Sequence, residues 1–142
     1  MRNRVKIAML SVAAAALLQG CVSGSGNVQS VSAEELVKQR AEERWALVID
    51  GRLESAYEYL TPAYRKAIPY NHYRKKIKGV GVWEKATVDT LVCEEEICNV
   101  TLKIWTVTHH ALLKKPIRAE SFLKEIWVKR ADYDTWYLQP DI

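Results

Sequence analysis

The change of hydrophobic period at Gly79 and Gly81 is the feature that most constrains the fold of this chain. Before these glycines, apolar residues recur at the three- and four-residue spacings of an amphipathic helix. From Trp83 onward they alternate with polar residues, as in a strand with one buried face. Helices followed by a run of strands indicate an α+β arrangement, so we expect N-terminal helices packed on a curved antiparallel sheet of about four strands.

The helical half carries its own start and stop residues. Ser32 followed by Glu35 predicts a capping box, and Gly51 can end the first helix in a left-handed conformation. Thr61 and Pro62 are typical of the N-cap and first position of a further helix. Shorter helices are therefore expected over residues 53–60, 63–68 and 70–78.

The strand half predicts a meander of four strands. We expect these strands near residues 86–93, 98–107, 122–128 and 135–138, with a loop at 111–119. Since side chains alternate between the two faces of a strand, one face of the first strand should carry Ala86, Val88, Thr90 and Val92. One face of the second should carry Cys98, Val100, Leu102 and Ile104.

The first 20 residues have the pattern of an export signal. Arg2, Arg4 and Lys6 form a cationic start, and the apolar run that follows, about a dozen residues, has the length of a signal-peptide core. A membrane-spanning helix needs roughly 20 apolar residues, so this run is too short to remain as an anchor. The run ends in Leu18-Gln19-Gly20-Cys21, which resembles the lipobox of bacterial lipoproteins.

This resemblance implies that residues 1–20 are a cleaved signal peptide and that Cys21 receives diacylglycerol, often with a further chain such as palmitate. Two or more acyl chains anchor a protein stably. In such lipoproteins, an Asp directly after the lipidated Cys favours retention in the inner membrane. This chain has Val22 there, so the resemblance implies attachment to the outer membrane, with the protein facing the periplasm. Residues 21–31 are then a flexible Gly/Ser tether and residues 32–142 a single domain. The alternative is an ordinary secretory signal followed by an unrelated cysteine.

Removal of the signal changes the charge of the chain. The precursor has 21 Lys and Arg and 17 Asp and Glu, which gives a net charge of +4. Without the three cations of the signal, 18 Lys and Arg and 17 Asp and Glu remain, which gives a net charge of +1. A nearly neutral chain gives no indication of nucleic-acid binding. The basic runs 74–78 and 114–118 are typical of solvated faces, although they could contact anionic lipid or an acidic partner.

The two remaining cysteines, Cys93 and Cys98, are expected to form a disulfide, because an exported chain reaches an oxidising compartment. If Glu95 and Glu96 form a two-residue turn, the cysteines lie opposite each other with their Cα atoms about 4.5 Å apart, a distance that suits a disulfide. A four-residue loop closed by the cysteines would bridge equally well. Redox catalysis is the less favoured alternative, since it usually needs a thiol activated at a helix N-terminus.

Residues 40–65 combine a helix that ends at Asp50-Gly51 with the link Ala56-Tyr57-Glu58-Tyr59-Leu60-Thr61-Pro62. Together with the final strand around Trp136, this pattern resembles the cone-shaped α+β superfamily of nuclear transport factor two, ketosteroid isomerase and scytalone dehydratase, over roughly residues 32–140. The resemblance implies a cone that often contains an apolar pocket. Candidate lining residues are Trp45, Tyr57, Trp105 and Trp127, unless these side chains fill the cone.

Enzymes of that superfamily use a carboxylate base and an oxyanion donor, commonly Tyr, inside the cone. Asp89 is a candidate acid, and Tyr57, Tyr59, Tyr64 and Tyr73 are candidate donors, but no spacing singles out a pair. No catalytic residue is therefore assigned. His109 and His110 should point to opposite faces of a strand, so neither a metal site nor a cofactor is expected.

These observations favour a non-catalytic lipoprotein with a binding or structural role in the cell envelope, acting on a protein partner or a small apolar ligand. A second hypothesis is a ketosteroid-isomerase-like enzyme acting on a small apolar substrate. A third is an accessory subunit of a secretion or conjugation apparatus. An open cone with an acid opposite a tyrosine would favour the enzyme, and a cone filled with aromatic side chains would count against it.

Overall fold

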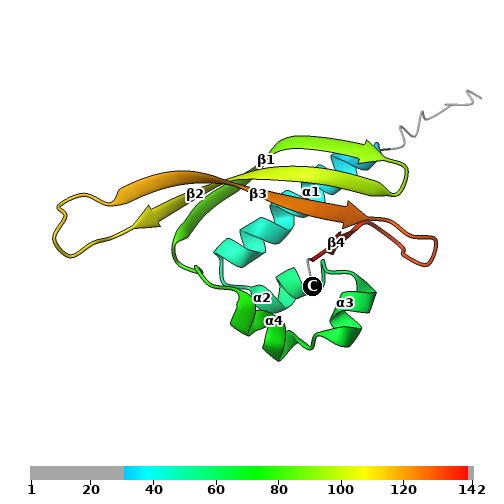
Figure 1. The fold of residues 1–142 in the computed structure, drawn as a ribbon, viewed down its shortest axis with the longest axis horizontal. Helices are drawn as coiled ribbons and strands as arrows, with labels where there is room; N and C mark the ends of the chain where they lie inside the picture. The colour runs from blue at the N-terminus through cyan, green and yellow to red at the C-terminus, as the bar shows by residue number, and fades with distance from the viewer. Residues whose placement is uncertain (1–30, 141–142) are drawn as a thin grey trace, which may run out of the picture.

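The computed structural model describes residues 31–140, so the expected signal, Cys21 and most of the expected tether lie outside the described residues. Four helices precede four strands along the chain (Figure 1). Their bounds are α1 Ala33–Ile49, α2 Leu53–Tyr57, α3 Pro62–Ala67, α4 Tyr70–Lys76, β1 Trp83–Glu94, β2 Ile97–Thr108, β3 Ile117–Val128 and β4 Tyr137–Gln139. The strands form an open antiparallel sheet in the order β1-β2-β3-β4. The predicted α+β class is confirmed.

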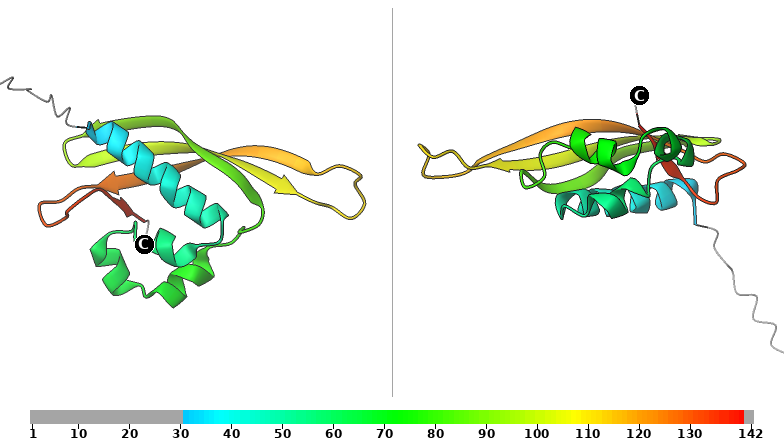
Figure 2. Two further views of the ribbon diagram at one scale, coloured as in Figure 1. Left: turned by 180° about the vertical axis from the view of Figure 1, so that it is seen from behind. Right: turned by 90° about the horizontal axis from the view of Figure 1, so that it is seen from below.

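The helix α1 crosses one face of the twisted sheet, and α2 to α4 group on the side of β4 (Figures 1 and 2). Because its apolar residues repeat at helical spacing, α1 turns Val37, Ala41, Trp45 and Val48 toward the sheet. These side chains belong to one hydrophobic core with the inner residues of β2, which are Cys98, Val100, Leu102 and Ile104. These four residues share one face of β2, as predicted, and the structure shows that this face is the buried one.

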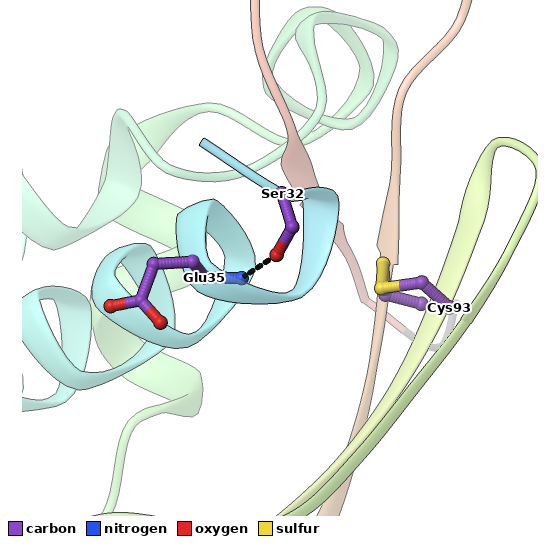
Figure 3. Close-up of a disulfide and its surroundings, with 4 residues drawn as sticks. Ser32, Glu35 and Cys93 are labelled. Atoms are coloured by element: carbon purple, nitrogen blue, oxygen red, sulfur yellow. Dashed lines mark hydrogen bonds between the residues drawn. A yellow bond between two sulfur atoms is a disulfide. The ribbon is translucent and has the colours of Figure 1, made fainter. Parts of the chain in front are cut away.

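Local capping residues set the helix starts as predicted. The Ser32 hydroxyl oxygen accepts a hydrogen bond from the Glu35 amide at 3.2 Å, drawn in Figure 3. The Thr61 hydroxyl oxygen accepts one from the Tyr64 amide at 3.3 Å at the start of α3. Gly51 follows α1 with φ at +74°, which favours glycine because a Cβ is strained in this conformation.

The fourth strand joins the two halves of the chain. The Thr61 amide donates to the Leu138 carbonyl oxygen at 2.9 Å, and the Leu138 amide donates to the Tyr59 carbonyl oxygen at 2.8 Å. Arg40 of α1 adds a hydrogen bond from its Nε to the Trp136 carbonyl oxygen at 2.7 Å. The link between α2 and α3 is thereby attached to β4, which itself pairs with β3.

A bulge in β1 changes the alternation that the sequence predicted. Val88 lies opposite Leu102, but Thr90 lies opposite Thr101, so Asp89 is an extra residue in β1. Beyond the bulge, Leu91 rather than Thr90 or Val92 packs against the core. The prediction that Thr90 and Val92 share a face with Ala86 and Val88 is therefore wrong, because the bulge reverses which residues point inward.

The strand β3 begins at Ile117 rather than near Phe122, and the predicted loop 111–119 is correspondingly shorter. Thr108 still pairs with Ile117, so β2 and β3 remain hydrogen-bonded over their whole length. Residues 117–124 are exposed, which removes the buried–exposed alternation by which a strand is recognised. The β2–β3 hairpin projects past the helices, away from the end where α1 begins (Figures 1 and 2).

Candidate functional site

A buried ion pair lies between α1 and the sheet. Arg44 of α1 and Glu125 of β3 are 6% and 8% exposed, and the Arg44 Nη1 donates to the Glu125 Oε1 at 2.9 Å. Two charged side chains are costly to bury unless each is paired and hydrogen-bonded. This pair is therefore the strongest candidate for a specialised site in the described part of the chain.

Two indole groups complete the surroundings of Glu125. The Trp45 Nε1 donates to Oε1 at 2.9 Å, and the Trp127 Nε1 donates to Oε2 at 3.0 Å. The Arg44 Nη2 donates to the Tyr73 hydroxyl oxygen at 3.3 Å, while the buried Arg44 Nε has no hydrogen-bond partner. Fixed donors thus contact both oxygens of the carboxylate, and its burial leaves little access for the substrate proton that a general base must reach.

The positions of Arg44 and Glu125 in the sequence indicate that both side chains point inward, although neither residue was predicted to be buried. Arg44 lies three residues after Ala41 and four before Val48, within the apolar face of α1. Glu125 lies two residues before Trp127, so both side chains point to the same face of β3. A charged residue at an inward position of each element indicates a buried pair, but only the fold shows that the two positions meet.

Three of the four candidate pocket residues are part of the core. Trp45 and Trp127 are 5% and 0% exposed and bind Glu125 as described. Tyr57 shares its hydroxyl between the carbonyl oxygens of Arg65 and Ile68, at 2.9 and 2.7 Å. Burial raises the pKa of the Tyr57 hydroxyl. These side chains fill the interior between helices and sheet.

The prediction for Trp105 is wrong. Trp105 alternates with the buried Ile104, so its ring lies on the outer face of the sheet, away from the helices. Its Nε1 donates to Glu120 at 2.9 Å, and the Lys85 and Lys103 ammonium groups each lie 5.1 Å from its ring centroid. Hydrogen bonds from Lys103, and then from Trp105, lower the pKa of the Glu120 carboxyl.

The candidate acid and tyrosines do not share a buried site. Asp89 is exposed at the β1 bulge, whereas Tyr57, Tyr64 and Tyr73 are buried in the core. Tyr59 is half-buried, and its hydroxyl donates to the Glu43 Oε2 at 3.2 Å. The interior acid is therefore Glu125, which the sequence analysis did not single out, and Asp89 is not opposite a tyrosine in a cone.

The cysteine prediction agrees with the structure. Cys93 pairs with Cys98 across β1 and β2, their Cα atoms are 4.0 Å apart, and they are joined as a disulfide (Figure 3). Glu95, with φ at +50°, and Glu96 form the two-residue turn. The bridge therefore closes the hairpin directly beside its turn.

Replacing both cysteines with serine should lower the free energy of unfolding by roughly 2 kcal/mol, because the closed loop is short and restricts the unfolded chain only modestly. Urea unfolding followed by circular dichroism would measure the loss. In the wild-type chain, thiol titration under denaturing, non-reducing conditions should find neither Cys93 nor Cys98 free. Two reactive thiols at these positions would contradict the assignment.

The described residues give no indication of a metal centre. His109 and His110 are exposed in the β2–β3 loop, and residues 31–140 contain no cluster of three or more His, Cys, Asp or Glu side chains that could hold an ion. An apolar hollow of about 150 Å³ is lined by Ala63, Tyr64, Ala67, Ile68 and Gln139. It is smaller than the roughly 300 Å³ at which small-molecule sites begin. Two larger hollows, of about 470 and 380 Å³, lie at the β1–β2 turn and across strands β1 to β3.

The helices within residues 31–140 are too short or too polar to span a membrane. No family model matches the chain, and a search of curated proteins found no match either.

Proposed function

We propose that this chain is the precursor of a bacterial envelope lipoprotein, held to the outer membrane through Cys21, whose periplasmic domain has a non-catalytic binding or structural role. The resemblance to the nuclear transport factor two superfamily is part of this proposal. The single observation that carries the non-catalytic role is the arrangement around Glu125. The acid is held by Arg44, Trp45 and Trp127 in a filled interior.

That arrangement favours the binding protein over the isomerase-like enzyme. An enzyme of that kind needs an interior carboxylate with room for a substrate beside it. Here Trp127, with no exposed surface, and Trp45 occupy the space next to the carboxylate. A structural ion pair accounts for the same residues without a substrate.

The distribution of exposed apolar side chains favours a protein partner over a small ligand. Large apolar residues are exposed along the projecting β2–β3 hairpin: Leu112, Leu113, Ile117, Phe122 and Leu123. Leu112 and Leu113 lie at the tip of the hairpin, Ile117 and Leu123 on its inner face and Phe122 on its outer face, and exposed apolar surface of this kind suits contact with another macromolecule. The hairpin also carries Lys114, Lys115 and Arg118, so an acidic partner would suit its charge.

The anchor predicts a large effect of one substitution. Cys21→Ala should abolish labelling by radioactive palmitate and move the chain from the membrane pellet to the soluble fraction, because the acyl chains supply the membrane affinity. The matched control is the Cys93→Ser/Cys98→Ser double variant, which should keep the label. Label retained in Cys21→Ala would show that the anchor has been misassigned.

The binding role is tested by crosslinking the full chain in native envelopes and isolating it with its partners. The expected result is a discrete adduct that disappears when Leu112 and Leu113 are replaced with serine. Recovery of secretion or conjugation components would select the apparatus-subunit hypothesis. Isomerase activity that is lost in Glu125→Gln would overturn the non-catalytic role.

A further inference from the structure

The strand β3 has a free edge along the projecting half of the β2–β3 hairpin. It pairs with β2 from Ile117 to Val128, but β4 covers its other edge only from Ile126 to Val128. Within residues 31–140, the second edge of residues 117–124 has no strand beside it, and all eight residues are exposed. This half of the hairpin extends beyond the helices (Figures 1 and 2). An exposed strand edge of this kind is a template for pairing with another chain.

The hydrogen-bond pattern shows which backbone groups point to that edge. The Lys129 amide donates to the Glu96 carbonyl oxygen at 2.9 Å, on the side of β2. In an antiparallel ladder, alternate residues turn their N–H and C=O groups to the same side, so the odd-numbered residues of β3 bond to β2. Even-numbered residues from 118 to 122 therefore offer free backbone groups. Phe122 is four residues before Ile126, where β4 begins, so a short strand added beside 118–122 does not meet β4.

The inner face of this stretch leaves room for apolar side chains of an added strand. Ser121 lies opposite Ile104, which is buried in the core, so the odd-numbered residues of β3 turn to the helix side of the sheet. Residues of an added strand opposite Ala119 and Ser121 would form non-hydrogen-bonded pairs, whose Cα atoms approach to about 4.5 Å. Larger apolar side chains at these two positions would cover the small residues and contact the exposed Ile117 and Leu123.

The charge of the hairpin favours an acidic segment. Residues 97–119 contain no Asp or Glu, whereas two lysines at 114 and 115 and Arg118 lie at the loop end of β3. Opposite charges that face each other across strands stabilise their pairing, and like charges destabilise it. Acids of an added strand are therefore best placed opposite Arg118 and beyond it, toward the loop.

Two ion pairs that already cross the sheet are compatible with this placement. Glu120 is held by Lys103, whose Nζ lies 2.6 Å from the Glu120 Oε2. The Arg118 Nε lies 3.4 Å from the Glu84 Oε2, and both of these side chains are exposed. A guanidinium has about five N–H donors, so Arg118 can also donate to an acid of an added strand.

We propose that the acidic partner of the hairpin adds an extended segment of about five residues to β3, hydrogen-bonded to Arg118, Glu120 and Phe122. The inference rests on the proposed binding role and names how that partner is recognised. The segment runs antiparallel to β3, which is the slightly more stable direction. Backbone hydrogen bonds supply the affinity of such a contact, and alternate side chains supply its selectivity.

A synthetic peptide tests the edge directly. The probe is an acetylated peptide of tyrosine, valine, threonine, valine, glutamate and glutamate, which places tyrosine opposite Phe122 and the first glutamate opposite Arg118. Added to the full chain in detergent at about ten times its Kd, it should slow amide hydrogen exchange at Glu120 and Phe122 by roughly tenfold, since about a tenth of the chain is then free. Exchange at Ala119 and Ser121, which bond to β2, should change little.

The matched control peptide has lysine in place of both glutamates and should bind roughly tenfold more weakly, because attractive pairs become repulsive. Equal binding of the two peptides would contradict the acidic character of the segment. No slowing at Glu120 and Phe122 with about 10 mM of the acidic peptide, which nearly saturates a site with a Kd of about 1 mM, would overturn strand addition.

A proline substitution tests the partner in native envelopes. Phe122→Pro removes an amide that faces the free edge and leaves the hydrogen bonds to β2 in place, and proline is tolerated at such edge positions. The crosslinked adduct should fall by roughly tenfold, because one backbone hydrogen bond is lost and the proline ring obstructs the edge. Phe122→Ala is the matched control, since it keeps the amide, and should lose less than about fivefold. Unchanged circular dichroism would show that both variants fold.

The outcomes separate strand addition from the proposed binding role. An adduct that requires Leu112 and Leu113 but is unchanged in Phe122→Pro would leave the binding role in place and exclude strand addition. Absence of any adduct from the wild-type chain would remove both. An adduct of twice the mass of the chain would identify a second copy as the occupant and rule out the acidic partner.

Discussion

Replacing Glu125 with alanine should lower the free energy of unfolding by about 3–5 kcal/mol, because the change leaves the buried Arg44 guanidinium without its counter-charge. The two indole N–H groups that bind the carboxylate would lose their acceptor as well. Since whole domains are stable by only about 5–15 kcal/mol, this variant should be close to the limit of folding. Urea unfolding of the chain, followed by circular dichroism, would measure the difference.

Two comparisons separate the buried pair from a general effect of removing an acid. Glu84→Ala removes the acid of an exposed ion pair, in which the Glu84 Oε2 lies 3.4 Å from the Arg118 Nε. This change should lower the free energy of unfolding by less than about 1 kcal/mol. The double variant Arg44→Met/Glu125→Met should be more stable than Glu125→Ala, because no unpaired charge remains. If Glu125→Ala costs no more than Glu84→Ala, the buried pair described here is wrong.

Replacing Trp127 with alanine should cost about 3–5 kcal/mol, in the range for large core aromatics. Trp127 has no exposed surface and packs between Tyr59 and the ion pair. Its matched control is Trp105→Ala, because the two tryptophans were predicted from sequence to line the same pocket. Trp105 lies on the outer face of the sheet. Apart from the effect of losing its hydrogen bond to Glu120, Trp105→Ala should therefore lower the free energy of unfolding by less than about 1 kcal/mol.

The same pair of variants distinguishes a filled interior from an open one. Trp127→Ala should create a cavity beside Glu125, and small apolar molecules should then stabilise the variant but not the wild type. Equal stabilisation of both proteins by such molecules, measured as a shift of Tm, would indicate a pre-existing pocket. Equal costs for the two tryptophan substitutions would contradict the placement of Trp105 outside the core.

The sequence predicted best the features that depend on neighbouring residues. The caps at Ser32 and Thr61 are local hydrogen bonds, and the structure contains both. The Cys93–Cys98 register followed from a two-residue turn, which is also local. The bulge at Asp89 could not be predicted in the same way, because it exists only relative to the residues of β2 that lie opposite.

The central pair was missed for a related reason. Arg44 and Glu125 are 81 residues apart, and each alone resembles a solvent-exposed charge. Their burial follows from how α1 lies on the sheet, which hydrophobic periodicity does not specify. The length of β3 was also underestimated, since an exposed hairpin carries no buried face to reveal it. Sequence patterns thus indicated the elements, while contacts between distant elements required the fold.

The attachment of β4 to the α2–α3 link has a consequence for the order of folding. Leu138 binds the backbone of Tyr59 and Thr61, and Trp136 accepts a hydrogen bond from Arg40. The ribosome makes residues 136–138 long after the helices that they hold, so the nascent helical half emerges without its final contacts. Because Trp136 and Leu138 belong to the core, the core is complete only after β4 has been synthesised.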